Sequence, residues 1–222
     1  VAVYVPGENV TRGLAVLGEA DRGARFAALR SHMPAAEAAR LYAGPLRAEL
    51  AAGPPSRRLL ERQYARAAGS PLRRMRYVDI TTYLADGLLP KVDVATMAFG
   101  VEARAPLLDH EVVRFGLSLP DAYCVDPNGG GKRVVRALLA RHVPTALFER
   151  PKQGFDLPLD HWLRGAVRGR TEALATSERL LGTGWFDAAG LAALVREHVG
   201  GARDHTQRLF GLLVLDEWLA RA

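Results

Sequence analysis

Residues 87–109 read GLLPKVDVATMAFGVEARAPLLD and place five charged side chains among residues that are otherwise small or apolar. The charged residues are Lys91, Asp93, Glu102, Arg104 and Asp109. An apolar matrix accepts a lone charge only at a large cost in free energy, so each charge is expected to be paired or to face a cleft. Two prolines interrupt the stretch, and Asp109 stands where a helix over 110–117 needs its N-cap. The pattern predicts a helix, a break at Pro90, an irregular turn before Pro106 and the start of a second helix.

The rest of the chain reads as mostly helical, because apolar residues recur every three or four positions and no useful alternating strand pattern is seen. Helices are expected over 24–30, 35–50, 57–67, 73–84, 110–117, 132–141, 159–177, 187–198 and 204–220. The last one is apolar nearly all round and is expected to be buried. We expect a single mostly helical segment over 1–222, with a variable lead-in over 1–70 and the sequence motifs over 71–222.

Composition limits the class of protein. Of the 222 residues, 49% are apolar, which argues against disorder and is enough for a real core. Cys124 is the single cysteine, so an internal disulfide and a cysteine-based zinc cluster are excluded and a reducing, cytoplasmic location is expected. No apolar run approaches the roughly 18 residues of a membrane span. The chain starts at Val1 rather than Met, which suggests a piece of a longer protein.

The charge balance is basic, at +6 with a pI near 9.9, which invites a nucleic-acid interpretation. The arginine clusters over 57–62 and 73–76 have acidic neighbours and no interleaved aromatic residues, so a solvated helix face is favoured over a nucleic-acid surface. Only three of the thirty basic residues are lysines, namely Lys91, Lys132 and Lys152. In a chain this biased toward arginine, lysine is expected to be kept where a compact, flexible ammonium is needed and a guanidinium fork will not serve. The three lysines are therefore candidate functional positions.

Residues 150–155 read RPKQGF and form the most suggestive loop. Lys152 and Gln153 stand between Pro151, which stiffens the approach, and Gly154, which lets backbone come close to a ligand. This arrangement suits contact with a phosphate chain, although an ordinary exposed loop is the alternative. The six histidines show no metal-ligand spacing, so no metal site is expected.

Together these motifs resemble the C-terminal signature of glutamine-hydrolysing asparagine synthetases. The resemblance covers about residues 77–219, where the motifs follow in the family's order. They are Lys91-Val-Asp93, Met97-Ala98, Glu102-x-Arg104-x-Pro106-x-Leu-Asp109, Lys132-x-x-x-Arg136, Arg150-Pro-Lys152-Gln153-Gly154-Phe155-x-x-Pro158, Trp162-Leu-Arg164 and Glu217-Trp-Leu219.

The resemblance implies the helical C-terminal half of an α/β ATP-pyrophosphatase-type synthetase domain, of the adenine nucleotide alpha hydrolase-like kind. It implies an ATP-dependent amidoligase that adenylates the aspartate side-chain carboxylate with Mg²⁺ and ATP and amidates it with glutamine-derived ammonia. By this resemblance Lys152 and Asp93 are catalytic, and the nucleotide contacts are Lys152, Gln153, Gly154 and Lys91. Glu102, Arg104 and Asp109 are expected to be structural. If Glu102 and Arg104 are buried charges, removing the partner of either costs about 3–5 kcal/mol.

Some family features are missing here. Val94, Ala105 and Leu107 depart from common family forms, and neither an N-terminal nucleophilic Cys nor a Ser-Gly-Gly-x-Asp-Ser loop occurs. The glutaminase and the nucleotide-binding segment, with most Mg²⁺ ligands, are therefore expected to lie upstream, and the chain alone is expected to be inactive. A related amide- or lactam-forming synthetase and a non-catalytic helical interaction module are the alternatives. A homo-oligomer is compatible with the sequence.

Overall fold

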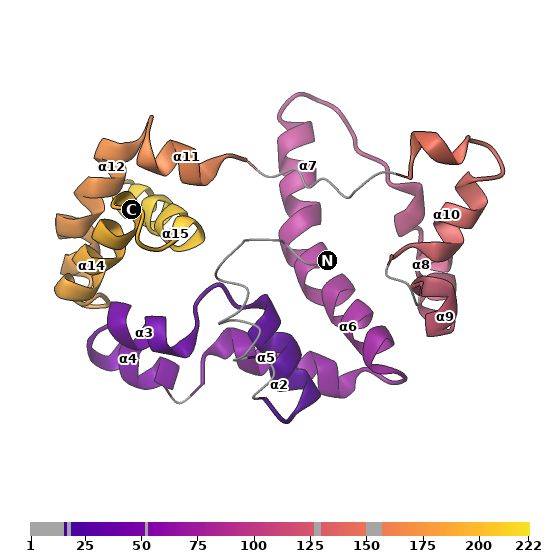
Figure 1. Cartoon of the computed structure of the whole chain (residues 1–222), viewed down its shortest axis with the longest axis horizontal. Helices are drawn as coiled ribbons and strands as arrows, with labels where there is room; N and C mark the ends of the chain where they lie inside the picture. Colours follow the sequence, from indigo (N-terminus) through magenta and orange to yellow (C-terminus); the bar gives the residue numbers. More distant parts are fainter. Residues whose placement is uncertain (1–15, 17–18, 52, 127–129, 150–156) are drawn as a thin grey trace. The chain divides into compact units, whose positions relative to one another are not determined.

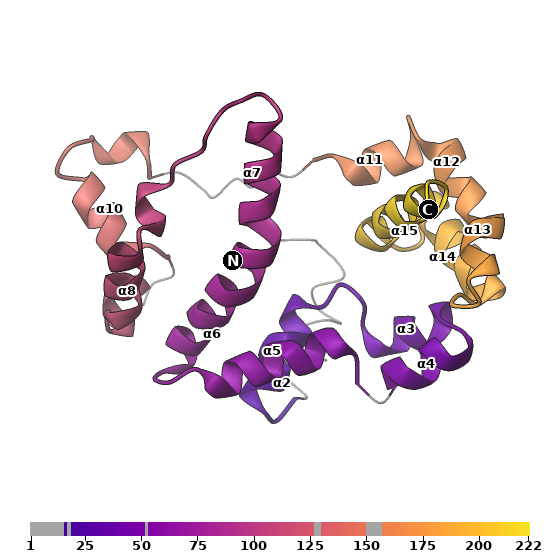
Figure 2. The ribbon, with the colours of Figure 1, turned by 180° about the vertical axis from the view of Figure 1, so that it is seen from behind.

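The computed structural model describes residues 16, 19–51, 53–126, 130–149 and 157–222, and Figures 1 and 2 show it from opposite sides. These residues are mainly helical and form two isolated β-bridges but no strand. The expected helical class is confirmed. Contacts divide the chain into two compact units, residues 1–59 with 154–222 (unit 1) and residues 60–153 (unit 2). That the chain is a single segment of one synthetase domain stays a prediction.

Unit 1 joins the first helices of the chain to the last ones. Its elements are α2 (Arg22–Arg30), α3 (Ala35–Leu41), α4 (Gly44–Ala51), α11 (Leu159–Arg164), α12 (Arg168–Ala173), the 3₁₀ turn η4 (Leu174–Thr176), α13 (Glu178–Gly182), α14 (Ala188–Val199) and α15 (Thr206–Leu219). Helix α5 (Pro55–Arg66) crosses the boundary between the units. Asp21, Ser177 and Asp187 each begin a helix by accepting a hydrogen bond from a first-turn backbone amide.

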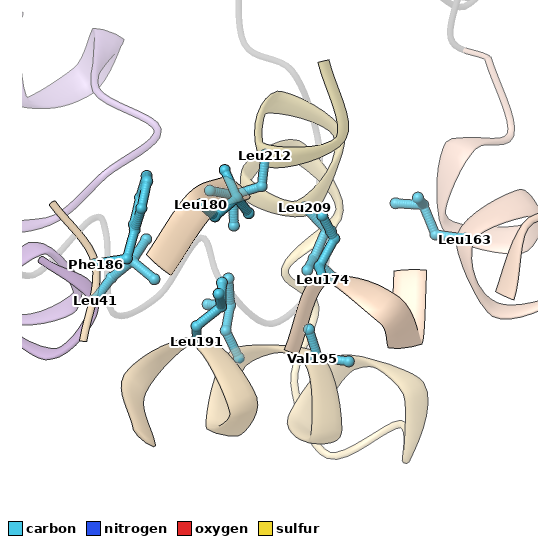
Figure 3. Packing of buried hydrophobic residues seen from close by; sticks show 10 residues of the cluster. Leu41, Leu163, Leu174, Leu180, Phe186, Leu191, Val195, Leu209 and Leu212 are labelled. Carbon is cyan, nitrogen blue, oxygen red and sulfur yellow. The ribbon is translucent and has the colours of Figure 1, made fainter. Parts of the chain in front are cut away.

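The core of unit 1 consists mainly of leucines from α11, η4, α13, α14 and α15 (Figure 3). Helix α14 contributes Leu191, Leu194 and Val195, and its next inward position by helical spacing is His198. A Cβ at Gly190 would lie 1.9 Å from the carbonyl oxygen of Arg40. Helix α14 can therefore approach the end of α3 this closely only because residue 190 has no side chain.

Three expectations for unit 1 are wrong in detail. The helix expected over 35–50 stops after Leu41 and restarts at Gly44, whose φ of +52° suits glycine. The helix expected over 159–177 breaks at Gly165 into α11, α12 and η4. The last helix is not buried all round, since Leu209 and Leu212 face the core while Phe210, Val214 and Trp218 are 43–60% exposed.

Unit 2 contains α6 (Pro71–Asp79), the π-helix η1 (Ile80–Leu88), α7 (Leu89–Met97), the 3₁₀ turn η2 (Pro106–Leu108), α8 (His110–Ser118), α9 (Asp121–Cys124), α10 (Arg133–Leu139) and the 3₁₀ turn η3 (Thr145–Leu147). The break expected at Pro90 is wrong, because α6, η1 and α7 follow one another without a gap (Figure 1). Pro90 is the second residue of α7 and directly follows the π-helical residues, where the hydrogen-bonding pattern changes and a missing amide hydrogen can be accommodated. The amide of Leu89 bonds back to Leu84, five residues earlier, in the π-helical pattern.

Unit 2 buries little of its apolar surface. Among its described residues only Tyr64, Ala67 and Val78 are buried apolar side chains, while many large ones from η1 to η3 are exposed. None of the described helices is long and apolar enough to cross a bilayer.

Candidate functional site

Lys91 and Asp93 lie on α7, and both are exposed. Within the described part of the chain neither side chain forms an ion pair, so both charges are open to a ligand. Residues two apart on a helix do not face each other. The two side chains therefore project from different sides of α7, and a small ligand held on one side of the helix contacts one of them rather than both.

Glu102 and Arg104 form an ion pair with each other, with 3.0 Å between Arg104 Nη2 and Glu102 Oε1. The expectation that these charges are paired is confirmed. The premise that they are buried is wrong, because the Glu102 side chain is 67% exposed and the Arg104 side chain 82% exposed. The pair follows the last turn of α7 and extends into solvent, where ion pairs are worth about 0–1 kcal/mol.

Asp109 is the N-cap of α8, as the sequence predicts. Its Oδ1 accepts a 2.8 Å hydrogen bond from the backbone amide of Glu111. The carboxylate also lies at the positive end of the helix dipole, which favours its charge. Asp109 thus sets where α8 begins.

The predicted phosphate contacts Lys152, Gln153 and Gly154 lie outside the described residues, so their role stays a prediction. The description resumes at Leu157, and α11 begins at Leu159. This helix is the first described element after the lysine loop.

Two of the three arginines over 73–76 connect α6 to the end of α8. Arg73 Nε donates to the carbonyl oxygen of Leu117 at 2.6 Å, and Arg76 Nη2 donates to that of Gly116 at 2.6 Å. Both carbonyls belong to the last turn of α8, where a cation is favoured by the helix dipole. These guanidinium groups are committed to the contact between α6 and α8, which agrees with the preference for a structural over a nucleic-acid role.

The structure also gathers charged residues around His198 near the end of α14, and of these only Arg164 belongs to a motif quoted from the sequence. The His198 side chain is 0% exposed. Its Nδ1 accepts a 3.2 Å hydrogen bond from the backbone amide of His205, and Arg164 Nη2 of α11 lies 3.5 Å from the same nitrogen. Because Nδ1 is the acceptor, the proton of the neutral ring belongs on Nε2. That atom is buried and has no hydrogen-bond partner among the described residues.

A second set of charges, centred on Glu197, links α14 to α3. Glu197 accepts a 2.6 Å hydrogen bond from Arg40 and lies 2.8 Å from His205 Nε2. Arg203 bridges to Glu37 at 2.7 Å and to Glu197 at 3.6 Å. The Arg40 hydrogen bond is the main cause that lowers the pKa of Glu197 to about 2, with a smaller contribution from His205.

Sequence reasoning missed both sets because it searched the histidines for metal-ligand spacing. A usable signal was present in two acid–histidine pairs seven residues apart, at 197–198 and 204–205. Helical spacing from Leu191 and Leu194 also directs position 198 inward. A histidine on a buried helix face next to an acid predicts a hydrogen-bonded network.

Asp160, His198 and Asp204 have ligand atoms within 4.8 Å of one another, which is close enough to consider a metal ion. Two contacts argue against it. Arg164 already supplies a cation, since its Nε donates to Asp160 at 2.7 Å. A metal on His198 Nε2 would place the ring proton on Nδ1, which faces the amide of His205 and so must accept. These residues fit a hydrogen-bonded junction better than a metal centre.

Comparison with known proteins places the chain in a family. The family model described as asparagine synthase matches residues 10–220. A Mycobacterium tuberculosis protein named "Putative asparagine synthetase (glutamine-hydrolyzing)" is 34% identical over 162 residues, which are 71% of this chain and 24% of that protein. Asparagine synthetase (glutamine-hydrolyzing) 1 of Bacillus subtilis is 27% identical over 149 residues, 67% of this chain and 23% of that protein.

No solved structure matches the chain. The chain spans about a quarter of the length of these curated relatives. With the family model covering nearly all of its residues, the chain belongs to the asparagine synthase family.

Proposed function

We propose that this chain is the helical C-terminal part of an ATP-dependent amidoligase that converts aspartate to asparagine with ammonia released from glutamine. The observation that carries the proposal is the order of the family motifs, from Lys91-Val-Asp93 to Glu217-Trp-Leu219, inside the matched residues 10–220. In this proposal the chain forms one side of a synthetase domain of the ATP-pyrophosphatase type. Upstream segments supply the nucleotide-binding sheet, the glutaminase and most Mg²⁺ ligands.

The proposed reaction has two steps. A side-chain carboxylate oxygen of aspartate attacks the α-phosphorus of ATP, and pyrophosphate leaves with the bridging oxygen. Ammonia then attacks the acyl carbon, loses a proton, and AMP departs with the carboxylate oxygen. Negative charge builds on the leaving pyrophosphate in the first step, so a preorganised cation there lowers the barrier. We assign this cation to Lys152.

The charges on α7 support the proposal in a more limited way. Lys91 is exposed and forms no ion pair within the described residues, so its ammonium is free to meet a phosphate. Asp93 projects from another side of the helix. The proposal therefore gives the nucleotide contact to Lys91. Asp93 makes a separate contact with a ligand, because a catalytic residue must touch the reacting molecules.

The test is Lys152→Ala in the full-length protein that carries this chain. If Lys152 stabilises charge on the departing pyrophosphate, the synthetase rate should fall by about 10²–10³, or roughly 2.7–4 kcal/mol of barrier. Glutamine hydrolysis and the thermal melt should stay near wild type, because the lysine acts on the transition state of one reaction only. AMP and pyrophosphate release with aspartate, ammonia and ATP gives the rate.

Lys152→Arg is the matched control, because it keeps the positive charge and replaces the ammonium group by a guanidinium group. A planar guanidinium fork cannot follow a moving phosphate as a flexible ammonium does, so this variant should restore little activity. Retention of most activity in the alanine variant would remove Lys152 from the reaction. If the alanine variant loses glutaminase activity and folding together, the loop over 150–155 has a structural role instead. A full-length protein that releases no pyrophosphate with aspartate would support the lactam-type or non-catalytic alternatives.

A further inference from the structure

His198 of α14 lies where three helices meet, and a single acceptor atom of its ring faces donor groups that belong to the other two. Helix α14 carries the ring, the residue before α15 donates its backbone amide to Nδ1, and Arg164 of α11 approaches the same nitrogen. A neutral imidazole has one lone pair on Nδ1 to meet these two donors. The arrangement therefore depends on the ring being neutral.

Protonation would reverse this chemistry. An imidazolium carries hydrogens on both nitrogens, so Nδ1 would point a donor at the His205 amide, 3.2 Å away, and toward the Arg164 guanidinium. The ring is fully buried, so its positive charge would also lose the solvation that it has in water. Both effects work against α11 keeping its present contact with α14.

The charged groups that act on the ring are Asp160 and Arg164 from α11, with Asp204 and His205 from the segment before α15. The carboxylates of Asp160 and Asp204 each lie 3.8 Å from a ring nitrogen and favour the protonated form. Both are already engaged, Asp160 by Arg164 at 2.7 Å and Asp204 by the amide and hydroxyl of the residue that opens α15.

Burial outweighs these carboxylates and, together with the Arg164 charge, holds the pKa of His198 below its ordinary value of 6.5. Because the folded pKa lies below the unfolded one, the neutral ring stabilises the fold fully above pH 6.5. That contribution is lost as the pH falls below 6.5. Glu197, the neighbouring acid on α14, is committed to Arg40 of α3 and to His205.

We propose that His198 is a positioning residue whose neutral ring pins α11 to α14 and α15, and that mild acid releases α11. The consequence for catalysis rests on the proposed function. Helix α11 is the first described element after the Lys152 loop, so its release would slow adenylation at acid pH while glutamine hydrolysis continues.

The chain carries its own reporter for this release. Trp162 lies on α11 and is 40% exposed, and the other tryptophans are Trp185 and Trp218. In a Trp185→Phe, Trp218→Phe background, the fluorescence and acrylamide quenching of Trp162 are followed from pH 8 to pH 4, with circular dichroism as the measure of total helix. We expect a reversible red shift and stronger quenching below pH 6.5 while the helix content is retained. No nucleotide or substrate is present, so failure of the proposed function would leave this test unaffected.

Three variants identify the group that titrates. His198→Asn keeps an acceptor near the Nδ1 position but cannot titrate, so the transition should disappear. His161→Gln removes the exposed histidine beside the reporter and should leave the transition in place. His205→Gln removes the other buried histidine and should also leave it in place. Persistence of the transition in His198→Asn, or its loss only in His161→Gln or His205→Gln, overturns the proposal.

A measurement on the unsubstituted ring covers the case in which His198→Asn fails to fold. The ¹H–¹³C resonances of the histidine rings give the midpoint of His198 directly in the otherwise wild-type chain. This midpoint must lie below 6.5 and coincide with the Trp162 transition. A different midpoint, or no Trp162 response before the helix content itself is lost, overturns the proposal.

Discussion

The two units of this chain differ in where they place their apolar residues. Among its described residues, unit 1 buries ten apolar side chains in one cluster, built from α14, α15 and the elements beside them. Unit 2 buries only Tyr64, Ala67 and Val78 among its described residues and exposes large apolar side chains such as Phe99 and Phe115. Yet unit 2 carries the stretch over 87–109 that is most recognisable in the sequence.

The difference shows that apolar residues are kept for two reasons in this chain: to form a core within a unit, and to form a surface that another surface can cover. In unit 1 the pattern of leucines at helical spacing is explained by a core within the unit. In unit 2 the same kind of side chains are exposed, and extended exposed apolar surface usually marks a place where another surface packs. This agrees with the proposal that the chain forms one part of a larger synthetase domain.

The largest effect that tests this contrast comes from matched leucine truncations. Leu209 is 0% exposed in the core of unit 1, so Leu209→Ala should cost about 2–5 kcal/mol of unfolding free energy. Leu138 on α10 of unit 2 is 56% exposed, and Leu138→Ala should change stability by less than about 0.5 kcal/mol. Denaturant unfolding followed by circular dichroism gives both values, and fluorescence of the three tryptophans, all in unit 1, reports that unit separately. Equal costs for the two variants would refute the contrast.

Two glycines of unit 1 test how closely its helices pack. Gly190→Ala places a methyl group 1.9 Å from the backbone carbonyl oxygen of Arg40, which cannot move without shifting α3, so we expect a loss of about 1–3 kcal/mol. Gly211→Ala on α15 meets nothing within 4 Å and should instead gain about 0.5–1 kcal/mol from helix propensity. Thermal melts of the two variants should therefore move in opposite directions. A stable Gly190→Ala would mean that α3 and α14 do not pack this closely.

Acid tests the ion pairs between α3 and α14. The folded pKa of Glu197 is lowered to about 2, so its stabilising contribution is complete above its ordinary pKa of 4.5 and is lost as the pH falls from 4.5 toward 2. The loss should be up to about 2 kcal/mol, since one pKa unit corresponds to about 1.4 kcal/mol and the side chain is partly exposed. In Glu197→Gln, unfolding free energy measured against pH should show a shallower slope in this window. An unchanged slope would assign the acid sensitivity to other groups.

Much of the fold could be predicted from the sequence, because helical periodicity and capping residues are local signals. The errors have local and non-local causes. The break after Leu41 has a local signal in the Gly44-Pro45 pair, which the helical spacing over 35–50 outweighed in the prediction. Its geometry is fixed by backbone hydrogen bonds that join Leu41 and Ala43 to the segment at 185–187. Pro90 is expected to break the helix, but the residues before it are π-helical, with the amide of Leu89 bonded to Leu84, and the helix continues through the proline.

The candidate site was predictable in its parts and not in its geometry. The cap role of Asp109 follows from the residue and its place before an apolar run. Burial at Glu102 and Arg104 does not follow from apolar neighbours in sequence, because those neighbours are themselves exposed in unit 2. The junction at His198 depends on contacts across more than thirty residues, to Arg164 and Asp160, which no sequence spacing reveals.

The smallest expected effect concerns the ion pair of unit 2. With side chains 67% and 82% exposed, Glu102 and Arg104 should contribute only about 0.2–1 kcal/mol to stability, in place of the 3–5 kcal/mol of a buried pair. Glu102→Gln and Arg104→Met should therefore melt close to wild type in this chain. The double variant should show little coupling, since an exposed pair is screened by water and salt.

The same variants in the full-length protein decide what the pair is for. If the surface of unit 2 is covered there by upstream segments, the pair leaves solvent, and breaking it by removing one partner becomes costly. A melt that drops by several degrees in the full-length protein but not in this chain would show that the exposed face of unit 2 is an internal interface. A wild-type melt in both, with a reduced synthetase rate, would move Glu102 and Arg104 from structural residues to contacts with the substrate. A large drop already in this chain would contradict the exposed geometry on which the comparison of the two units depends.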